Sequence, residues 1–206
     1  MAQRLERRKP PPFSGAFDVV AVAASAGGLV ALKEILGGLP ANFPAALVIV
    51  QHLDPRHPSL MATILARHTL LEVKEAENRD RLRAGTAFVA PPNRHLLVNS
   101  DGSLSLTQTE LVHFLRPSAD LLFESVAASF KTRAIAVVLT GSGTDGSIGV
   151  QAIKKTGGTV IVQDRATSEF PSMPQSALET GCVDLVLPLS QIAPKLLQLV
   201  ARVKAA

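Results

Sequence analysis

The chain has 206 residues, 47% of them hydrophobic, which allows one domain with a sizeable core. Its formal charge of +4 lies mostly in residues 1–15, which carry a net +3, so the rest is nearly neutral and offers no basic, aromatic-rich surface for nucleic acid. No apolar run approaches the roughly 20 residues of a membrane-spanning helix, and the single cysteine, Cys182, can form no internal disulfide, so we expect a cytoplasmic protein without membrane insertion.

Residues 1–15, MAQRLERRKPPPFSG, are basic and rich in proline. Such a segment has too little apolar surface to fold by itself, so we predict a flexible tail. We expect residues 16–206 to form a single domain, because we find no internal repeat and no sign of a second domain in them.

Five short segments are rich in Val and Ile and nearly free of charge, as strands covered on both faces should be. They are residues 17–23, 45–51, 133–140, 158–163 and 182–188. Between them lie segments with apolar residues three and four positions apart, a spacing typical of helices. These are residues 27–39, 59–70, 118–130, 145–158 and 172–181. Alternation of strands and helices predicts parallel strands joined by crossover helices.

Residues 86–108 differ from this pattern, because they contain two alternating runs around Ser-Asp-Gly, which is typical of a hairpin. We therefore predict the α/β class: a doubly wound, mainly parallel sheet with crossover helices on both faces and an inserted antiparallel β-hairpin.

Three residues with catalytic potential follow predicted strands. Ser25 follows the first strand, His52 the second, and Asp145 stands in the glycine-rich loop after the strand at 133–140. Chemistry in such open sheets is found where the carboxyl ends of the strands converge. A hydroxyl, an imidazole and a carboxylate at neighbouring strand ends are the parts of a serine hydrolase.

Each residue type suits one role. A serine in a tight turn before two glycines would be presented at a helix amino terminus, where free N–H groups can stabilise an oxyanion. Its hydroxyl needs a neighbouring base, and histidine titrates near neutral pH. Asp145 begins a helix, which favours the ionised carboxylate that can orient the imidazole. The order Ser, His, Asp differs from the Ser, Asp, His order of ordinary α/β-hydrolases.

Residues 141–146, GSGTDG, also match the dinucleotide-binding pattern, with Asp164 near the spacing of a ribose-binding acid. Against a nucleotide, Asp145 would face the pyrophosphate, and the first strand–helix unit, where such motifs usually occur, holds Ser25 instead. A dinucleotide-binding oxidoreductase therefore remains a less favoured alternative.

The histidines other than His52 support no further site. His52, Asp54 and His57 have a spacing that metal ligands use, but Pro55 and Pro58 break any helix that would align them, so we predict no metal and no cofactor. We assign no catalytic role to the remaining histidines, which are His68, His95 and His113.

Several segments taken together resemble the catalytic domain of the CheB family, the protein-glutamate methylesterases of bacterial chemotaxis. They include VAASAGGLVALKEIL, VIVQHLDP, VAPPNRHLLV, RPSADLLFESVA, VVLTGSGTDGSIGVQAIKKTGG and QDRATSEFPSMPQSALETGCVDLVLPL, in order from about Val19 to Leu189. The resemblance implies a doubly wound sheet with an inserted hairpin. It assigns the nucleophile to Ser25, the base to His52 and the orienting carboxylate to Asp145.

The resemblance further implies hydrolysis of γ-glutamyl methyl esters on chemoreceptors or receptor-like proteins, without a metal or organic cofactor. Some members also deamidate glutamine. Backbone N–H groups around Ala26 and Ser142 would form the oxyanion hole. A catalytically quiet module that only docks on receptors is the alternative within the same fold.

Some features depart from the family pattern. Ala23 and Ala26 replace a glycine and a threonine around the nucleophile, and Ser142 replaces a methionine. These changes resemble a branch in which the domain is fused to a methyltransferase or to sensor modules. The chain has no room for the receiver domain that typically precedes this one, so we expect a separate regulator, such as a response regulator, a constitutively open site, or a longer parent protein.

Overall fold

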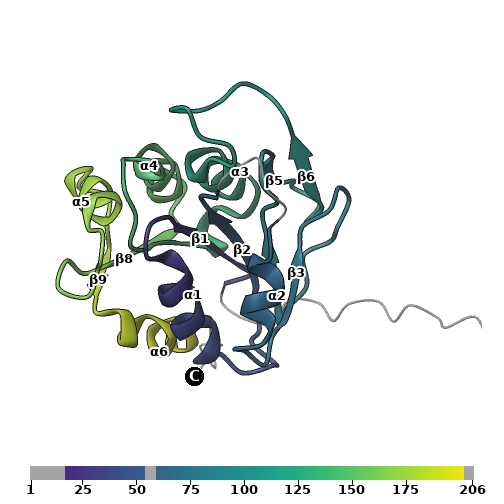
Figure 1. Ribbon diagram of the computed structural model, residues 1–206, viewed down its shortest axis with the longest axis horizontal. Helices are drawn as coiled ribbons and strands as arrows, with labels where there is room; N and C mark the ends of the chain where they lie inside the picture. Colours follow the sequence, from purple (N-terminus) through teal and green to yellow (C-terminus); the bar gives the residue numbers. More distant parts are fainter. Residues whose placement is uncertain (1–16, 54–58, 202–206) are drawn as a thin grey trace, which may run out of the picture.

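The centre of the fold is a parallel sheet. The computed structural model describes residues 17–53 and 59–201, and within them seven strands pair in parallel in the order β3-β4-β2-β1-β7-β8-β9 (Figure 1). Their bounds are β1 Val19–Ala24, β2 Ala46–Gln51, β3 Glu72–Glu75, β4 Thr86–Val89, β7 Ala134–Val138, β8 Thr159–Gln163 and β9 Leu185–Leu187.

Helices cover both faces of this sheet (Figure 1). One face packs against α1 (Gly28–Gly37), α2 (Met61–Ala66) and α6 (Leu189–Val200). The other packs against α3 (Ala119–Phe130), α4 (Ser147–Lys155), α5 (Ser172–Glu179) and an antiparallel hairpin of β5 (His95–Val98) and β6 (Leu104–Thr107). A short 3₁₀ turn, Lys131–Arg133, connects α3 to β7.

The two cores follow from the period of two in the strands. In β1, Val19, Ala21 and Ala23 point into the core beneath α3 and α4, whereas the residues between them point toward α1 and α6. Every residue of β1 and β2 is buried, as expected for parallel strands covered on both sides.

The predicted fold class is confirmed, including the inserted hairpin, but the predicted strand count is too low. Residues 86–89 belong to the main sheet as β4 instead of to the hairpin insertion, and β3 was not predicted. The sequence of β3, EVKE, is charged because this edge strand pairs only with β4 and is exposed at both of its ends. Helix α6, with Pro194 inside it, was also not predicted.

The topology places one crevice at the ends of three strands. Strand β1 lies between β2, which the chain reaches through α1 on one face of the sheet, and β7, which it reaches through α3 on the other face. Such a switch point is where open sheets bind ligands. Ser25, His52 and the loop to Asp145 follow these three strands.

The predicted tail, residues 1–15, lies outside the described residues. Across the described ranges, no helix combines the length and apolar character needed to cross a membrane.

Candidate active site

Ser25 occupies a tight strand-to-helix turn. Its N–H donates to the carbonyl of Thr140, two residues after β7 (3.0 Å), and its carbonyl accepts from the N–H of Gly28, the first residue of α1 (2.9 Å). Gly27 has φ = +74°, a left-handed conformation that glycine adopts without strain. The turn therefore presents the partly buried Ser25 side chain at the amino end of α1.

One side chain links the turn at Ser25 to His52. The Gln51 side-chain amide donates to the carbonyls of Ser25 (2.8 Å) and His52 (3.1 Å), and the His52 N–H donates to Ala24 (3.1 Å). The Gln51 amide packs against Gly28, where a Cβ would approach its oxygen to 2.1 Å. The ends of β1 and β2 are thus held together directly behind the two side chains.

Asp145 lies beside His52 and is surrounded by donors. Its Oδ2 accepts from His52 Nε2 (2.8 Å) and from the Ala119 N–H (2.6 Å). Its Oδ1 accepts from the Ser118 hydroxyl (2.9 Å) and from the Asp120 N–H (3.1 Å). Residues 93 positions apart in the chain therefore meet at one carboxylate, which is bound at the amino terminus of α3.

These contacts keep the Asp145 carboxylate ionised. Burial alone raises the pKa of this group, which is only 2% exposed, but the hydrogen bond from His52 and the N–H groups of Ala119 and Asp120 lower it by more. The net pKa lies below the ordinary aspartate value. A permanently charged acceptor at Oδ2 orients the imidazole with its proton on Nε2.

The third contact of a triad is not formed in this structure. Within the described part of the chain, the Ser25 hydroxyl makes no hydrogen bond to His52 or to any other side chain. Because Nε2 is taken by Asp145, Nδ1 is the ring nitrogen left to accept a proton. Such contacts are often long in unliganded enzymes and shorten when the substrate binds.

Two N–H groups near Ser25 are suited to bind an oxyanion. Those of Ala26 and Ser142 donate to no acceptor among the described residues, and both residues are at least partly exposed. Ala26 is held by its carbonyl, which accepts from the Thr140 hydroxyl (3.1 Å), and the loop at Ser142 is held by the bond from the Gly143 N–H to Ser172 Oγ (3.1 Å).

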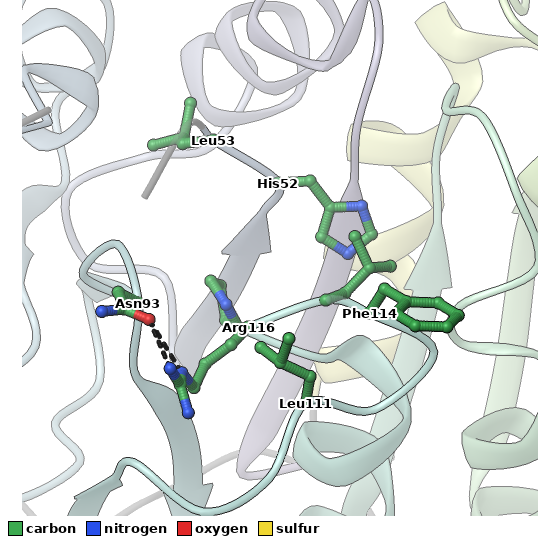
Figure 2. A pocket seen from close by; sticks show the side chains of 8 residues that line it. His52, Leu53, Asn93, Leu111, Phe114 and Arg116 are labelled. Atoms are coloured by element: carbon green, nitrogen blue, oxygen red, sulfur yellow. Dashed lines mark hydrogen bonds between the residues drawn. The ribbon is translucent and has the colours of Figure 1, made fainter. Parts of the chain in front are cut away.

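A cavity of about 250 Å³ opens beside His52. Its other lining residues are largely apolar: Leu53, Leu111, Phe114, Leu115 and Pro117, with Asn93 and Arg116. Figure 2 shows the Asn93–Arg116 pair across the cavity from His52 and Phe114. Arg116 donates through Nε (2.9 Å) and Nη2 (2.7 Å) to Asn93 Oδ1, and through Nη1 to the Thr109 carbonyl (2.6 Å). Arg116 thus fixes the loop that forms this wall.

Sequence reasoning missed the residues that hold Asp145. Ser118 is the N-cap of α3, and its N–H donates to Nδ1 of the fully buried His95 (3.2 Å). Burial lowers the pKa of His95, so the neutral ring accepts from Ser118 and donates from Nε2 to the Glu110 carbonyl (3.0 Å). The Ser-x-Asp sequence at the start of a helix is a capping signal that could have indicated this. His68 contacts the Ile64 carbonyl at the end of α2, away from the site.

The glycine-rich loop, residues 141–146, carries Asp145 to the side of His52. Asp164, the supposed ribose ligand, accepts from the Thr167 N–H (2.9 Å) and hydroxyl (2.6 Å) and so closes its own turn. In residues 17–53 and 59–201, no cluster of three or more His, Cys, Asp or Glu side chains could hold a metal. Asp54 and His57 of the rejected metal pattern lie outside these ranges.

The close packing of α3 against α4 holds the Asp145 loop in place, and Gly149 allows it. A Cβ at this position would lie 2.5 Å from the Phe123 Cβ and 3.1 Å from the Asp120 carbonyl oxygen. We expect Gly149→Ala to lower the free energy of unfolding by about 1–3 kcal/mol, because the helices must separate. Urea denaturation measures this loss. Gln151→Ala, on the exposed side of α4, is the control, and equal stability of the two variants would contradict the packing argument.

Comparisons with known proteins agree with this architecture. The family model for CheB methylesterase matches residues 20–196. The crystal structure of the Thermotoga maritima CheB methylesterase catalytic domain superposes with a TM-score of 0.86 at 37% identity, covering 89% of this chain and 99% of that one.

Curated relatives extend the match. A Leptospira interrogans protein is 40% identical over 183 residues, covering 89% of this chain and 95% of its own. The Moorella thermoacetica protein-glutamate methylesterase/protein-glutamine glutaminase is 42% identical over 203 residues, which are 97% of this chain and 47% of that protein. The chain thus spans about half the length of some relatives and nearly all of others. The fold, the strand-end residues and these matches together show that the chain belongs to the CheB methylesterase family.

Proposed function

We propose that the protein is a serine esterase that hydrolyses γ-glutamyl methyl esters on chemoreceptors or receptor-like signalling proteins, with glutamate and methanol as products. The observation that carries this proposal is the hydrogen bond between His52 and the buried Asp145 beside the Ser25 turn. An imidazole oriented by a buried carboxylate near a serine at a helix start is the arrangement needed for acyl transfer. Family membership agrees with this chemistry.

The reaction proceeds in two halves. Ser25 Oγ attacks the ester carbonyl while His52 Nδ1 takes its proton, and the resulting oxyanion accepts hydrogen bonds from the Ala26 and Ser142 N–H groups. Collapse of this intermediate expels methanol, which leaves with the proton from His52. Water then attacks the acyl-serine with His52 again as base, and the glutamate side chain and Ser25 are regenerated.

The same residues support deamidation of glutamine. With an amide in place of the ester, the first half-reaction releases ammonia and forms the same acyl-serine. The names of the relatives from Moorella thermoacetica and Burkholderia orbicola include both activities. Asp145 stabilises the imidazolium in either case.

The partners follow from the substrate. Methylated glutamates on chemoreceptors would be met in the cytoplasm, where we place the protein. Some relatives are about twice as long as this chain, so regulation by a separate response regulator, and pairing with a separate methyltransferase, are part of the proposal.

Release of methanol from methylated receptor fragments tests the function. We expect the purified protein to release methanol from fragments carrying glutamyl methyl esters and none from unmethylated fragments. A docking module would bind the methylated fragment without methanol release, which would contradict the esterase. Titration with NAD and NADP is the control for the oxidoreductase alternative and should show no binding.

A further inference from the structure

The amino termini of helices α3 and α4 are each capped by a carboxylate that belongs to the other helix or to the loop before it. Asp145, just before α4, accepts from the N–H groups of Ala119 and Asp120 in the first turn of α3. In return, Oδ1 of Asp120 accepts from the N–H of Gly149 in the first turn of α4 (2.7 Å). Each helix start is therefore capped by an acid from the other helix.

The close packing of α3 against α4 leaves these two carboxylates little room to move. The backbone of Asp120 lies so close to Gly149 that a Cβ there would meet the Asp120 Cα at 3.1 Å. The Asp120 side chain is 4% exposed, and it binds α4 at Gly149, four positions after Asp145. A shift of Asp120 would therefore be passed to Asp145 through a single helical turn.

Asp120 is also an electrostatically costly residue at this position. Burial raises its pKa to about 6, the charge of Asp145 adds to the rise, and N–H groups at the start of α4 oppose it. Its Oδ2 is buried without a hydrogen-bond partner in the described part of the chain. The groups that face it are Asp145 from the α4 loop and His113, whose Nε2 lies 3.9 Å from Oδ2. Through Asp145 it is linked to His52.

A cap alone does not require this second charge. A neutral asparagine would offer the same acceptor to Gly149 without adding a second buried charge beside Asp145. The contact that acts on the site is therefore the acceptor oxygen that Asp120 offers to Gly149.

We propose that Asp120 is a positioning residue of the active site, which holds Asp145 against His52 through α4. The inference rests on the proposed function for its kinetic consequence. Asp120 is buried behind Asp145, so its influence on the reaction passes through Asp145 and His52.

Two variants test the role of the acceptor oxygen of Asp120. Asp120→Ala removes the acceptor for Gly149, and we expect kcat for methanol release to fall about 10- to 100-fold with KM within about twofold, because only the alignment of the triad changes. Asp120→Asn keeps the acceptor, and kcat should recover to within about threefold of wild type.

A readout without substrate separates this inference from the proposed function. The His52 N–H signal of the hydrogen bond to Asp145, followed by NMR, should shift in Asp120→Ala and keep its wild-type position in Asp120→Asn. Glu124→Gln, which removes an exposed carboxylate from the same helix, should change neither this signal nor the kinetics. Failure of the wild type to release methanol would overturn the proposed function and leave the His52 signal as the test of Asp120.

Two results would contradict the proposed role of Asp120. A His52 N–H signal in Asp120→Ala at the same position as in wild type would overturn the positioning role. A kcat in Asp120→Ala that falls only in proportion to the folded fraction, measured by circular dichroism, would overturn the positioning role. Should Asp120→Ala not fold, a kcat for Asp120→Asn within threefold of wild type supports positioning by the acceptor, and a larger loss counts against it.

Discussion

Replacement of Ser25 by alanine is expected to lower kcat for methyl-ester hydrolysis about 10⁴- to 10⁶-fold, because the acyl-enzyme can no longer form. The residual rate would come from the oxyanion donors and substrate binding alone. The fold should survive, since Ser25 contributes to it through its backbone: its N–H binds Thr140 and its carbonyl binds Gly28 and Gln51. We expect the free energy of unfolding to change by about 0.5 kcal/mol or less.

Initial rates of methanol release and urea denaturation measure both effects. Ser100→Ala, at the exposed turn of the β5–β6 hairpin, is the matched control and should leave both unchanged. Methanol release by Ser25→Ala within tenfold of wild type would show that another group, or a directly activated water, attacks the ester. Loss of folding in this variant would show instead that the hydroxyl has a structural role.

The strand-end residues were predictable because the apolar runs that mark the strands also mark the places where the strands end. Short apolar runs mark β1, β2 and β7, and the residue types that follow them, Ser25, His52 and Asp145, are those of acyl transfer. Parallel strands point the same way, so their ends must converge whatever the details of packing. The sequence alone could therefore place these three side chains at one edge of the sheet.

The support around Asp145 was not predictable in the same way. Ser118 and Asp120 are 27 and 25 residues from Asp145, and His95 is 23 residues from Ser118. Contacts of this range between a helix start, a hairpin and a loop have no periodicity, because they depend on how α3 and α4 are packed. The edge strand β3 was missed because a half-exposed strand carries few apolar residues, so its sequence lacks the apolar run that marks a buried strand.

The structure also explains why the glycine-rich loop resembles a nucleotide site. Both kinds of site need a backbone that turns sharply from a strand into a helix start, and Gly143 and Gly146 have φ of +95° and +98°. In a nucleotide site, the N–H groups of the helix start would bind phosphate. Here the N–H groups of α4 and α3 are capped by Asp120 and Asp145, so the anions are supplied by the protein itself.

Asp145→Asn is the second change with a large expected effect. Each Asp145 oxygen accepts two donors, whereas an asparagine amide has one acceptor oxygen. The arrangement that loses least puts that oxygen at the Oδ2 position, toward His52 and Ala119, and its NH₂ group toward Ser118, whose hydroxyl can turn to accept. The His52 tautomer is then kept, but the negative charge that stabilises the imidazolium is lost. We expect kcat to fall about 10²- to 10⁴-fold with little change in KM. Asp164→Asn, which changes an acid at the next strand end, should retain wild-type kcat and would lose it if a nucleotide took part.

The same substitution tests the origin of stability at the site. In Asp145→Asn the Asp120 N–H faces an NH₂ group and is buried without an acceptor, which costs about 1–3 kcal/mol of unfolding free energy at pH 7. Because the pKa of Asp145 is lowered in the folded state, its contribution is present above the unfolded-state value of about 4 and is lost as the pH falls through the lower folded-state value. The stability difference between wild type and Asp145→Asn should therefore shrink only as the pH falls below about 4, measured by urea denaturation from pH 7 down to about 2. A difference that is constant with pH would mean that the shape of the amide, and not the charge of the carboxylate, determines the stability of this helix junction.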